Sequence, residues 1–390
     1  MTERSLASYR TEFPILEHTT YLVSHSLGAM PRAVYDDVRA FCEAWATRGV
    51  RAWHEGWWDM GRETGDLLAP ILGVGPGTIS MHQNVAVALG IILSACDFSG
   101  TRNRIVVSDV EFPSNLYLFE NWRKYGAEIV VVESPDGIHP ATEALLDAID
   151  ERTVLVPFSY VLFRSSAIQD ARAIIDKAHS VGARVVADAY QAAGTIPLAL
   201  GALEADFAVG GSVKWLCGGP GAGYLYVRPD LVPRLEPALV GWAAHRRPFD
   251  FAVGAIEYAD GLERFQSGTP NVPTFYSARA GYRLVHEVGL DRIRAHSLAL
   301  TRRVMDHADA RGWRVRTPRA DAARGGTVTI DLPNGESIAR ALIAREVIVD
   351  YRPGAGIRMA PHYYTSVDEI ELALGVLDEL VAAMPPPADA

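Results

Sequence analysis

The stretch Ala208-Val209-Gly210-Gly211-Ser212-Val213-Lys214-Trp215-Leu216 places a lysine between an apolar strand and the turn Cys217–Gly221. Burying an ammonium group at such a place is costly unless the group is paired or chemically converted. Desolvation also lowers the pKa of an amine and makes it a better nucleophile. The other lysines, Lys124 and Lys177, fall on polar faces of predicted helices, where a solvated side chain is expected. Lys214 is therefore the candidate reactive lysine, and an imine with an aldehyde cofactor would remove the cost of its charge.

Around this lysine the chain alternates short β-rich runs with helix-like stretches, from about residue 75 to residue 230. The β-rich runs are residues 104–108, 127–132, 153–157 and 183–188. Continuous apolar strands of this kind are buried on both faces, which is typical of a parallel sheet covered by helices. The pattern predicts an α/β fold with a mainly parallel central sheet.

The C-terminal part has a different pattern, with predicted strands at 327–331 and 346–350 and helices at 336–344 and 367–382. It predicts a smaller α+β domain. The expected domain organisation is an N-terminal segment (1–20) packing with the small domain, a large cofactor-binding domain (21–274), the small domain (275–384) and a disordered tail (385–390).

Composition limits the classes of function. The 390 residues are 49% hydrophobic and 22% charged, as in ordinary soluble globular proteins. The net charge of −10 argues against a nucleic-acid partner, and no apolar run reaches the roughly 18 residues needed to span a membrane. The N-terminus does not resemble a secretory signal. Cys42, Cys96 and Cys217 lack metal-ligand spacing and leave an odd thiol, which favours a reducing cytoplasm and no metal site.

Asp188 ends a strongly apolar strand, and ligands of open parallel sheets bind beyond the carboxyl ends of the strands. An aspartate there can pair with the pyridinium nitrogen of pyridoxal phosphate and keep it protonated, which makes the ring an electron sink. The alternative for Asp188 is a helix N-cap or a salt bridge at the sheet end. The residues considered at strand ends are Ser80, Asp109, Ser159 and Asp188.

A phosphate site is predicted where residues 80–86 pass from a short strand into an apolar helix that begins at Val85. Free backbone amides at a helix N-terminus bind phosphate without a basic side chain. Asn84 is also a good N-cap, which would explain it without a ligand. Ser212, two residues before the lysine, could add a hydroxyl group.

Together these residues resemble the fold-type I pyridoxal phosphate enzymes of the class V aminotransferase group, and within that group the kynureninases most closely. The resemblance covers nearly the whole chain. The matching segments are 24–28 ("NSLG"), 112–117 ("FPSD.Y"), 188–194 ("D.AHA.G"), 211–221 (the lysine and its "GGPG" tail), 241–249 ("GW.GH...F") and 357–361 ("IR.AP").

The resemblance implies a role for several residues. Phe112 would stack on the cofactor ring, and Gln191 would contact the cofactor. Arg358 would hold the substrate α-carboxylate, a role that a guanidinium fork also suits physically. His25 and Ser26 are expected to bind the substrate as well. The enzymes of this family are homodimers with shared active sites, so Trp242 and Thr269 would reach the neighbour's cofactor.

Departures from the family pattern bear on the reaction. Kynureninases have a tyrosine immediately before the lysine, where this chain has Val213. The histidine of "D.AH" is replaced by Gln191 and the aspartate of "FPSD" by Asn115. These changes keep the cofactor chemistry but make kynurenine hydrolysis itself doubtful.

The leading hypothesis is a lyase that cleaves Cβ–S or Cβ–Cγ in a β-substituted L-amino acid through an external aldimine, in bacterial specialised metabolism. Relatives of this type include carbon–sulfur lyases of natural-product assembly. The alternative is an aminotransferase, epimerase or decarboxylation-coupled oxidative deaminase on the same scaffold. A cysteine desulfurase is disfavoured, because its cysteine should lie on a mobile loop in the C-terminal half. A catalytically silent binding module is disfavoured because Lys214, Asp188 and Arg358 occur together.

Overall fold

The computed structural model describes residues 4–384, so the predicted disordered tail (385–390) lies outside the described residues. A seven-stranded sheet forms the centre of the molecule, in the order β2-β8-β7-β6-β5-β3-β4. All neighbouring strands are parallel except β8, which runs antiparallel to both β2 and β7. The predicted α/β fold with a mainly parallel sheet is therefore confirmed. Its strands are β2 (Ile79–His82), β3 (Arg104–Ser108), β4 (Glu128–Val132), β5 (Thr153–Ser159), β6 (Arg184–Asp188), β7 (Phe207–Gly211) and β8 (Gly223–Val227).

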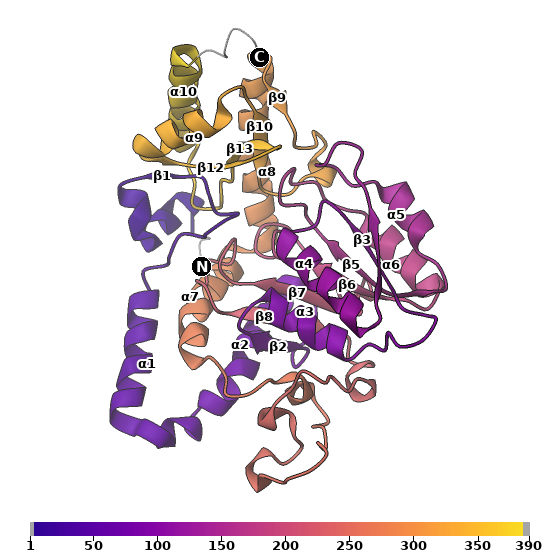
Figure 1. The fold of residues 1–390 in the computed structure, drawn as a ribbon. Coiled ribbons are helices and arrows are strands. Elements are labelled where there is room, and N and C mark those ends of the chain that lie inside the picture. The colour runs from indigo at the N-terminus through magenta and orange to yellow at the C-terminus, as the bar shows by residue number, and fades with distance from the viewer. Residues whose placement is uncertain (1–3, 385–390) are drawn as a thin grey trace.

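Helices cover both faces of this sheet (Figure 1). They are α2 (Trp57–Leu72), α3 (Val85–Ser94), α4 (Pro113–Asn121), α5 (Thr142–Ala148), α6 (Ala171–Ser180) and α7 (Val272–Val288), while α1 (Val34–Arg48) packs on α7 away from the sheet. Alternate strand residues point to opposite faces, so Val185 and Ala187 join the core beneath α2, α6 and α7, whereas Val186 joins the core beneath α3 and α4. Strands buried on both faces explain the continuous apolar runs in the sequence.

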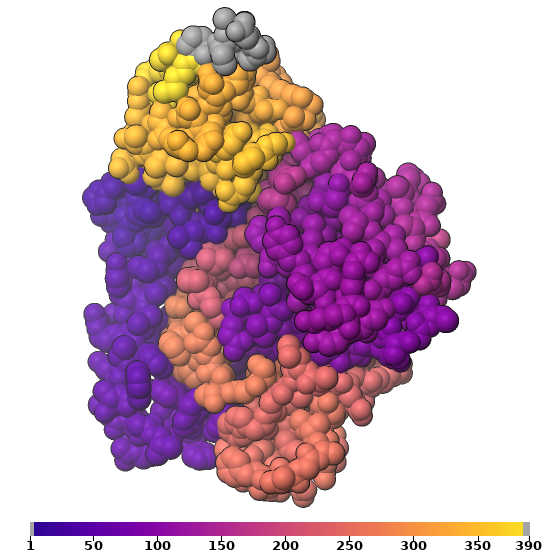
Figure 2. Space-filling model, in the orientation of Figure 1, coloured from indigo at the N-terminus to yellow at the C-terminus, as the bar shows by residue number. Residues whose placement is uncertain are grey.

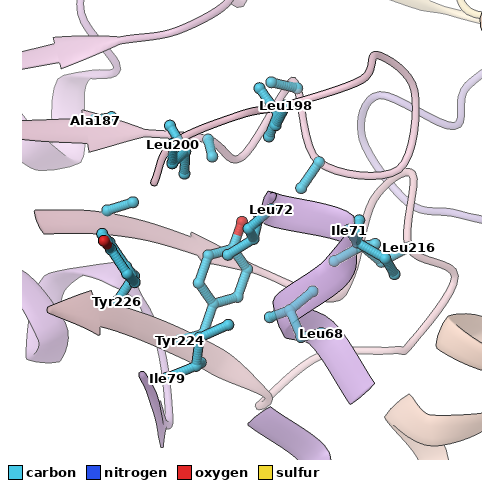
Figure 3. Packing of buried hydrophobic residues seen from close by; sticks show 14 of the residues in the cluster. Leu68, Ile71, Leu72, Ile79, Ala187, Leu198, Leu200, Leu216, Tyr224 and Tyr226 are labelled. Carbon is cyan, nitrogen blue, oxygen red and sulfur yellow. The ribbon is translucent and has the colours of Figure 1, made fainter. Parts of the chain in front are cut away.

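Figure 3 shows part of the first core, where the rings of Tyr224 and Tyr226 on β8 lie among aliphatic side chains. Leu68 and Leu72 of α2 pack there against the sheet, and both are fully buried. This packing fixes the position of β8 and of the turn after Lys214.

The C-terminal part builds a four-stranded antiparallel sheet in the order β12-β13-β10-β9. Its elements are α8 (Leu290–Ala310), β9 (Arg314–Val315), β10 (Val328–Asp331), α9 (Gly335–Ala344), β11 (Val347–Ile348), β12 (Asp350–Arg352), β13 (Gly356–Met359) and α10 (Val367–Ala383). The prediction of one strand over 346–350 is wrong. The chain divides there, because Val347 and Ile348 pair with β1 (Thr20–Tyr21) while Asp350 starts β12 in the antiparallel sheet.

The N-terminal segment contacts the C-terminal part through β1 and through Arg10, which forms an ion pair with Glu369. Helix α7 packs against α1 and α2 rather than against the small sheet. The domain division near residue 275 stays a prediction, and the packing of α7 favours a boundary close to Gly289. None of the helices within residues 4–384 is long and apolar enough to cross a membrane.

Candidate active site

A cavity of about 350 Å³ opens at the carboxyl ends of β5 and β6, beside the first turns of α3 and α4. This is the edge where ligands of doubly wound sheets bind. The predicted site residues that line it are Asn84, Val85, Phe112, Asp188, Gln191 and Lys214. These residues come from four separate parts of the chain, and the fold brings them together at one cavity.

Lys214 lies in the turn after β7, and its ammonium group faces the cavity. Nζ is 4.2 Å from the ring centroid of Tyr190 and 5.6 Å from that of Phe112. Burial lowers the pKa of Lys214 to about 8, and the nearby carboxylate of Asp188 only partly opposes this shift. An amine with this pKa has a larger uncharged fraction near neutral pH than an ordinary lysine, so it is better suited to attack a carbonyl carbon.

Asp188 ends β6 and is buried, with both carboxylate oxygens held in place. Oδ1 accepts a hydrogen bond from the backbone N–H of Tyr190, and Oδ2 accepts one from Nδ2 of Asn115, both at 2.9 Å. Burial raises the pKa of Asp188, while these hydrogen bonds and Lys214 act in the opposite direction. The side chain is therefore a fixed carboxylate at the floor of the cavity.

The N-terminus of α3 forms another wall. Oδ1 of Asn84 accepts a hydrogen bond from the backbone N–H of Val87 at 3.0 Å, which confirms the predicted N-cap. The two amides before Val87, those of Val85 and Ala86, have no partner within the helix, so they are available to an anion. Gly223 of β8 passes directly beneath, because a Cβ atom there would lie 2.8 Å from Cα of Asn84.

These groups fit pyridoxal phosphate. Lys214 supplies the amine for an imine, Asp188 a partner for a pyridinium N–H, Phe112 an aromatic face, and the start of α3 the donors for a phosphate. Among the described residues, no cluster of histidine, cysteine and acidic side chains is arranged to hold a metal ion.

Arg358 does not line the cavity, and its guanidinium is hydrogen-bonded to other groups of the protein. Its Nε donates to Oδ1 of Asp350 at 2.7 Å, its Nη2 pairs with Oδ2 of Asp350, and its Nη1 donates to the carbonyl of Phe163 at 2.6 Å. His25, which is buried, also contacts Oδ1 of Asp350 through Nε2 at 3.0 Å. Burial and the charge of Arg358 lower the pKa of His25 to about 3, so this imidazole is neutral. Arg352 completes the cluster, 3.1 Å from Asp350 and with 42% of its side chain exposed.

Other predicted site residues lie outside the cavity wall. The hydroxyl of Ser212 is bonded to the carbonyl of Ala222 at 2.6 Å and to the hydroxyl of Tyr282 at 2.5 Å. Trp242 and Thr269 are exposed and line no part of the cavity that holds Lys214. Ser26 is half-buried and follows His25 in a turn closed by its own N–H and the carbonyl of Val23.

The sequence did not single out several side chains that the fold places here. Asn115 is a departure from the kynureninase pattern in the sequence, and in the structure its amide donates a hydrogen bond to Asp188. Tyr190 faces Lys214, and its place two residues after Asp188 is the sequence signal that could have identified it. Glu111 is buried behind the cavity and accepts hydrogen bonds from Ser159, which lines the cavity, and from Gln169. Burial raises the pKa of Glu111 to about 7.

Comparisons with known proteins agree with this site. The profile of the family described as aminotransferase class-V matches residues 20–362. A kynureninase from Pseudomonas fluorescens is 30% identical, over 97% of this chain and 92% of its own length. Among solved structures, an apo cysteine desulfurase from Thermococcus onnurineus superposes with a TM-score of 0.88 at 23% identity, covering 98% of this chain and 100% of the other.

A second solved structure, the cystine C–S lyase C-DES with its product cysteine persulfide, has a TM-score of 0.83 at 22% identity and covers 94% of this chain and 98% of the other. The structural likeness supports the fold type. The chain belongs to the class V aminotransferase family, with a fold-type I architecture and pyridoxal 5′-phosphate as its cofactor.

Proposed function

We propose that this enzyme cleaves the Cβ–S or Cβ–Cγ bond of a β-substituted L-amino acid, with Lys214 as the covalent anchor of its cofactor. The observation that carries the proposal is the enclosed Lys214 amine, whose pKa is lowered to about 8, in one cavity with the fixed carboxylate of Asp188. When bound, pyridoxal phosphate supplies an electron sink for the bond that breaks at the substrate.

The residues of the cavity would have separate roles in binding the cofactor and in proton transfer. Asp188, held by Asn115 and by the N–H of Tyr190, would keep a proton on the ring nitrogen. The amide groups at the start of α3 would bind the phosphate. Lys214, once released by the substrate amine, would carry protons to and from the substrate carbons as general base and acid.

The substrate carboxylate would bind at the arginine pair beside the cavity. Asp350 and the carbonyl of Phe163 hold Arg358 in one orientation, and Arg352 offers the more exposed guanidinium. A carboxylate could bind bidentately to the exposed guanidinium of Arg352, because Asp350 already occupies the Nε–Nη2 edge of Arg358. His25 would act through Asp350, because it is neutral and its Nε2 contacts that carboxylate.

The cysteines favour a lyase over a desulfurase that needs a cysteine nucleophile. Cys217 is buried, and burial raises its pKa to about 12, so its thiolate is scarce near neutral pH. Cys42 and Cys96 lie on α1 and just after α3, and no cysteine of the described chain lines the cavity. Sulfur released from a substrate would therefore leave with the product rather than transfer to the protein.

A panel of S-substituted cysteines, kynurenine and unsubstituted amino acids tests the reaction. We expect pyruvate and ammonia from C–S cleavage, or alanine from hydrolytic Cβ–Cγ cleavage. Lys214→Ala should abolish turnover and the absorbance of the lysine-linked cofactor, whereas Lys177→Ala, in α6 and not part of the cavity lining, should change neither. Stoichiometric 2-oxo acid without cleavage would instead identify an aminotransferase, D-amino acid an epimerase, and oxygen consumption an oxidative deaminase.

We also propose a homodimer with shared active sites. Helix α1 has no buried residue although it carries Tyr35 and Trp45, which are 57% and 65% exposed. The segment of residues 241–270, with Trp242 and Thr269, projects at the lower edge of the molecule (Figure 2). Mixing inactive Lys214→Ala subunits with inactive Trp242→Ala subunits should restore activity if Trp242 serves the neighbouring site. Unchanged inactivity of verified mixed dimers would contradict sharing.

The cellular setting is a further part of the proposal. Three free cysteines, one of them buried, favour a reducing cytoplasm. The departures from the kynureninase pattern at Val213, Gln191 and Asn115 favour a substrate of bacterial specialised metabolism over kynurenine. A kynurenine turnover that exceeds that of every S-substituted cysteine would contradict this last point.

A further inference from the structure

Tyr190 presents the face of its ring to Lys214. The ammonium nitrogen is 4.2 Å from the Tyr190 centroid, closer than the 5.6 Å that separates it from the Phe112 centroid. Both rings line the cavity. The family pattern "D.AHA.G" has an alanine at the place of Tyr190, so this large ring is a feature of the present chain.

The surrounding structure is built to accept the ring. The backbone N–H of Tyr190 donates to Oδ1 of Asp188 at 2.9 Å, which fixes the start of the side chain. At the other end, Gly211 leaves the space that the phenol fills. A Cβ atom on Gly211 would lie 2.6 Å from Oη and 2.7 Å from Cζ of Tyr190. A methyl group there would have to displace the tyrosine.

We propose that Tyr190 is a positioning residue of the cofactor site, whose ring holds the ammonium form of Lys214 and, with Phe112, gives the cavity two aromatic faces for a flat heteroaromatic cofactor. The inference deepens the proposed function, because it concerns the same lysine. The effect belongs to the ring rather than to the hydroxyl, which makes no hydrogen bond to the protein within residues 4–384.

The physical basis is the attraction between a cation and the negative face of an aromatic ring, which strengthens where water is excluded. This attraction favours the charged amine, whereas burial favours the neutral one. The charged groups that also act on Lys214 are Asp188, Asp350, Arg352 and Arg358. All four groups are retained when only residue 190 changes. Replacing Tyr190 with an aliphatic residue therefore isolates the contribution of the aromatic ring.

The first test uses the full chain freed of cofactor. Each lysine is labelled with acetic anhydride between pH 6 and 10, and the modified peptides are quantified by mass spectrometry. Tyr190→Phe should leave the labelling midpoint of Lys214 unchanged. Tyr190→Leu, which keeps an apolar side chain without the aromatic face, should lower the midpoint by about one pH unit or more, as expected for a desolvated cation–π contact. An unchanged midpoint in Tyr190→Leu would overturn the proposal.

The chain contains a matched control. Nζ of Lys124 lies 5.1 Å from the centroid of Tyr125, a ring that is 58% exposed to water. Tyr125→Leu should shift the labelling of Lys124 much less than Tyr190→Leu shifts that of Lys214. Equal shifts would show that enclosure of the Tyr190 contact has no effect and would contradict the proposal.

The second test measures pyridoxal phosphate affinity by equilibrium dialysis. Gly211→Ala should weaken binding by about tenfold or more, because its methyl group displaces the ring, but should have little further effect in a Tyr190→Ala background. If Gly211→Ala weakens pyridoxal phosphate binding equally in the native and the Tyr190→Ala backgrounds, the inference is overturned. The two proposals can fail separately: retention of a lysine-linked cofactor spectrum in Lys214→Ala would refute the proposed function, while the labelling midpoints would still report on Tyr190.

Discussion

Nδ2 of Asn115 donates a hydrogen bond to Oδ2 of Asp188 at 2.9 Å, across 73 residues of sequence. Asn115 lies in the first turn of α4 and Asp188 at the end of β6, so the contact joins a helix to the edge of the sheet. Where the kynureninase pattern has an aspartate, this chain has a neutral donor. The charge of the cofactor-facing carboxylate is thus stabilised by an amide.

Replacing Asn115 tests this stabilisation. Asn115→Leu should raise the pKa of Asp188 further and weaken pyridoxal phosphate binding by about tenfold or more, since hydrogen bonds to charged groups contribute about 1.5–3 kcal/mol. The loss should be largest at acid pH, where Asp188 becomes protonated. Equilibrium dialysis across pH 5–8 measures it, with Asn121→Leu at the exposed end of α4 as the control. If Asn115→Leu binds pyridoxal phosphate as tightly as the native enzyme at every pH, the proposed role of Asn115 is contradicted.

Glu111 should make the protein less stable as pH rises. Burial raises its pKa from 4.5 to about 7, so between these values the folded state binds more protons than the unfolded state. The free energy of unfolding should therefore fall over this window, by an upper bound of about 3 kcal/mol. Glu111→Gln should remove this pH-dependent fall in the free energy of unfolding. The variant should therefore become more stable, relative to the native protein, between pH 5 and pH 7. Urea unfolding at each pH measures the difference, and a constant difference would refute the prediction.

Asp350 should stabilise the fold with the opposite pH dependence. Burial alone would raise its pKa, but hydrogen bonds from His25 and Arg358 outweigh burial and hold the pKa well below 3.8. This stabilisation is present above the ordinary pKa and is lost as pH falls. Asp350→Asn should destabilise the protein by about 3–5 kcal/mol near neutral pH, because it leaves Arg358 buried without its charge partner.

The destabilisation by Asp350→Asn should shrink below about pH 4, which thermal unfolding of both proteins at matched pH can measure. Asp36→Asn is the control, since Asp36 pairs with Arg39 on an exposed part of α1. A destabilisation that stays constant into the acid range would show that charge is not its origin.

Gly223 should be intolerant of a side chain. A methyl group would press on the backbone of Asn84 and displace the start of α3, where the phosphate is proposed to bind. Gly223→Ala should cost about 1–3 kcal/mol of stability and weaken binding of pyridoxal phosphate. Gly375→Ala, where a Cβ atom meets nothing within 4 Å, is the matched control and should leave both quantities near native values or slightly raise stability. Native affinity in Gly223→Ala would contradict the placement of the phosphate.

The sequence by itself determined the local features. The runs at 104–108 and 183–188 are apolar throughout because both faces of those strands are covered, and the structure has strands there. Asn84 caps α3 through a bond to a residue three positions away, a contact that local sequence can encode. Lys214 stood out because it alone among the lysines lies between an apolar strand and a glycine-rich turn.

Only the tertiary structure decided which partners these side chains have. Arg358 was expected to face a substrate, yet β12 and β13 pair in a register that places it directly opposite Asp350, and the guanidinium binds that carboxylate. Ser212 was expected at the cofactor, but packing against Tyr282 directs its hydroxyl elsewhere. Tyr190 can face Lys214 because Gly211 has no side chain and leaves the space that the phenol occupies. Such contacts depend on strand register and on residues distant in sequence, so local patterns specify which groups are available and the packing of the fold specifies what they meet.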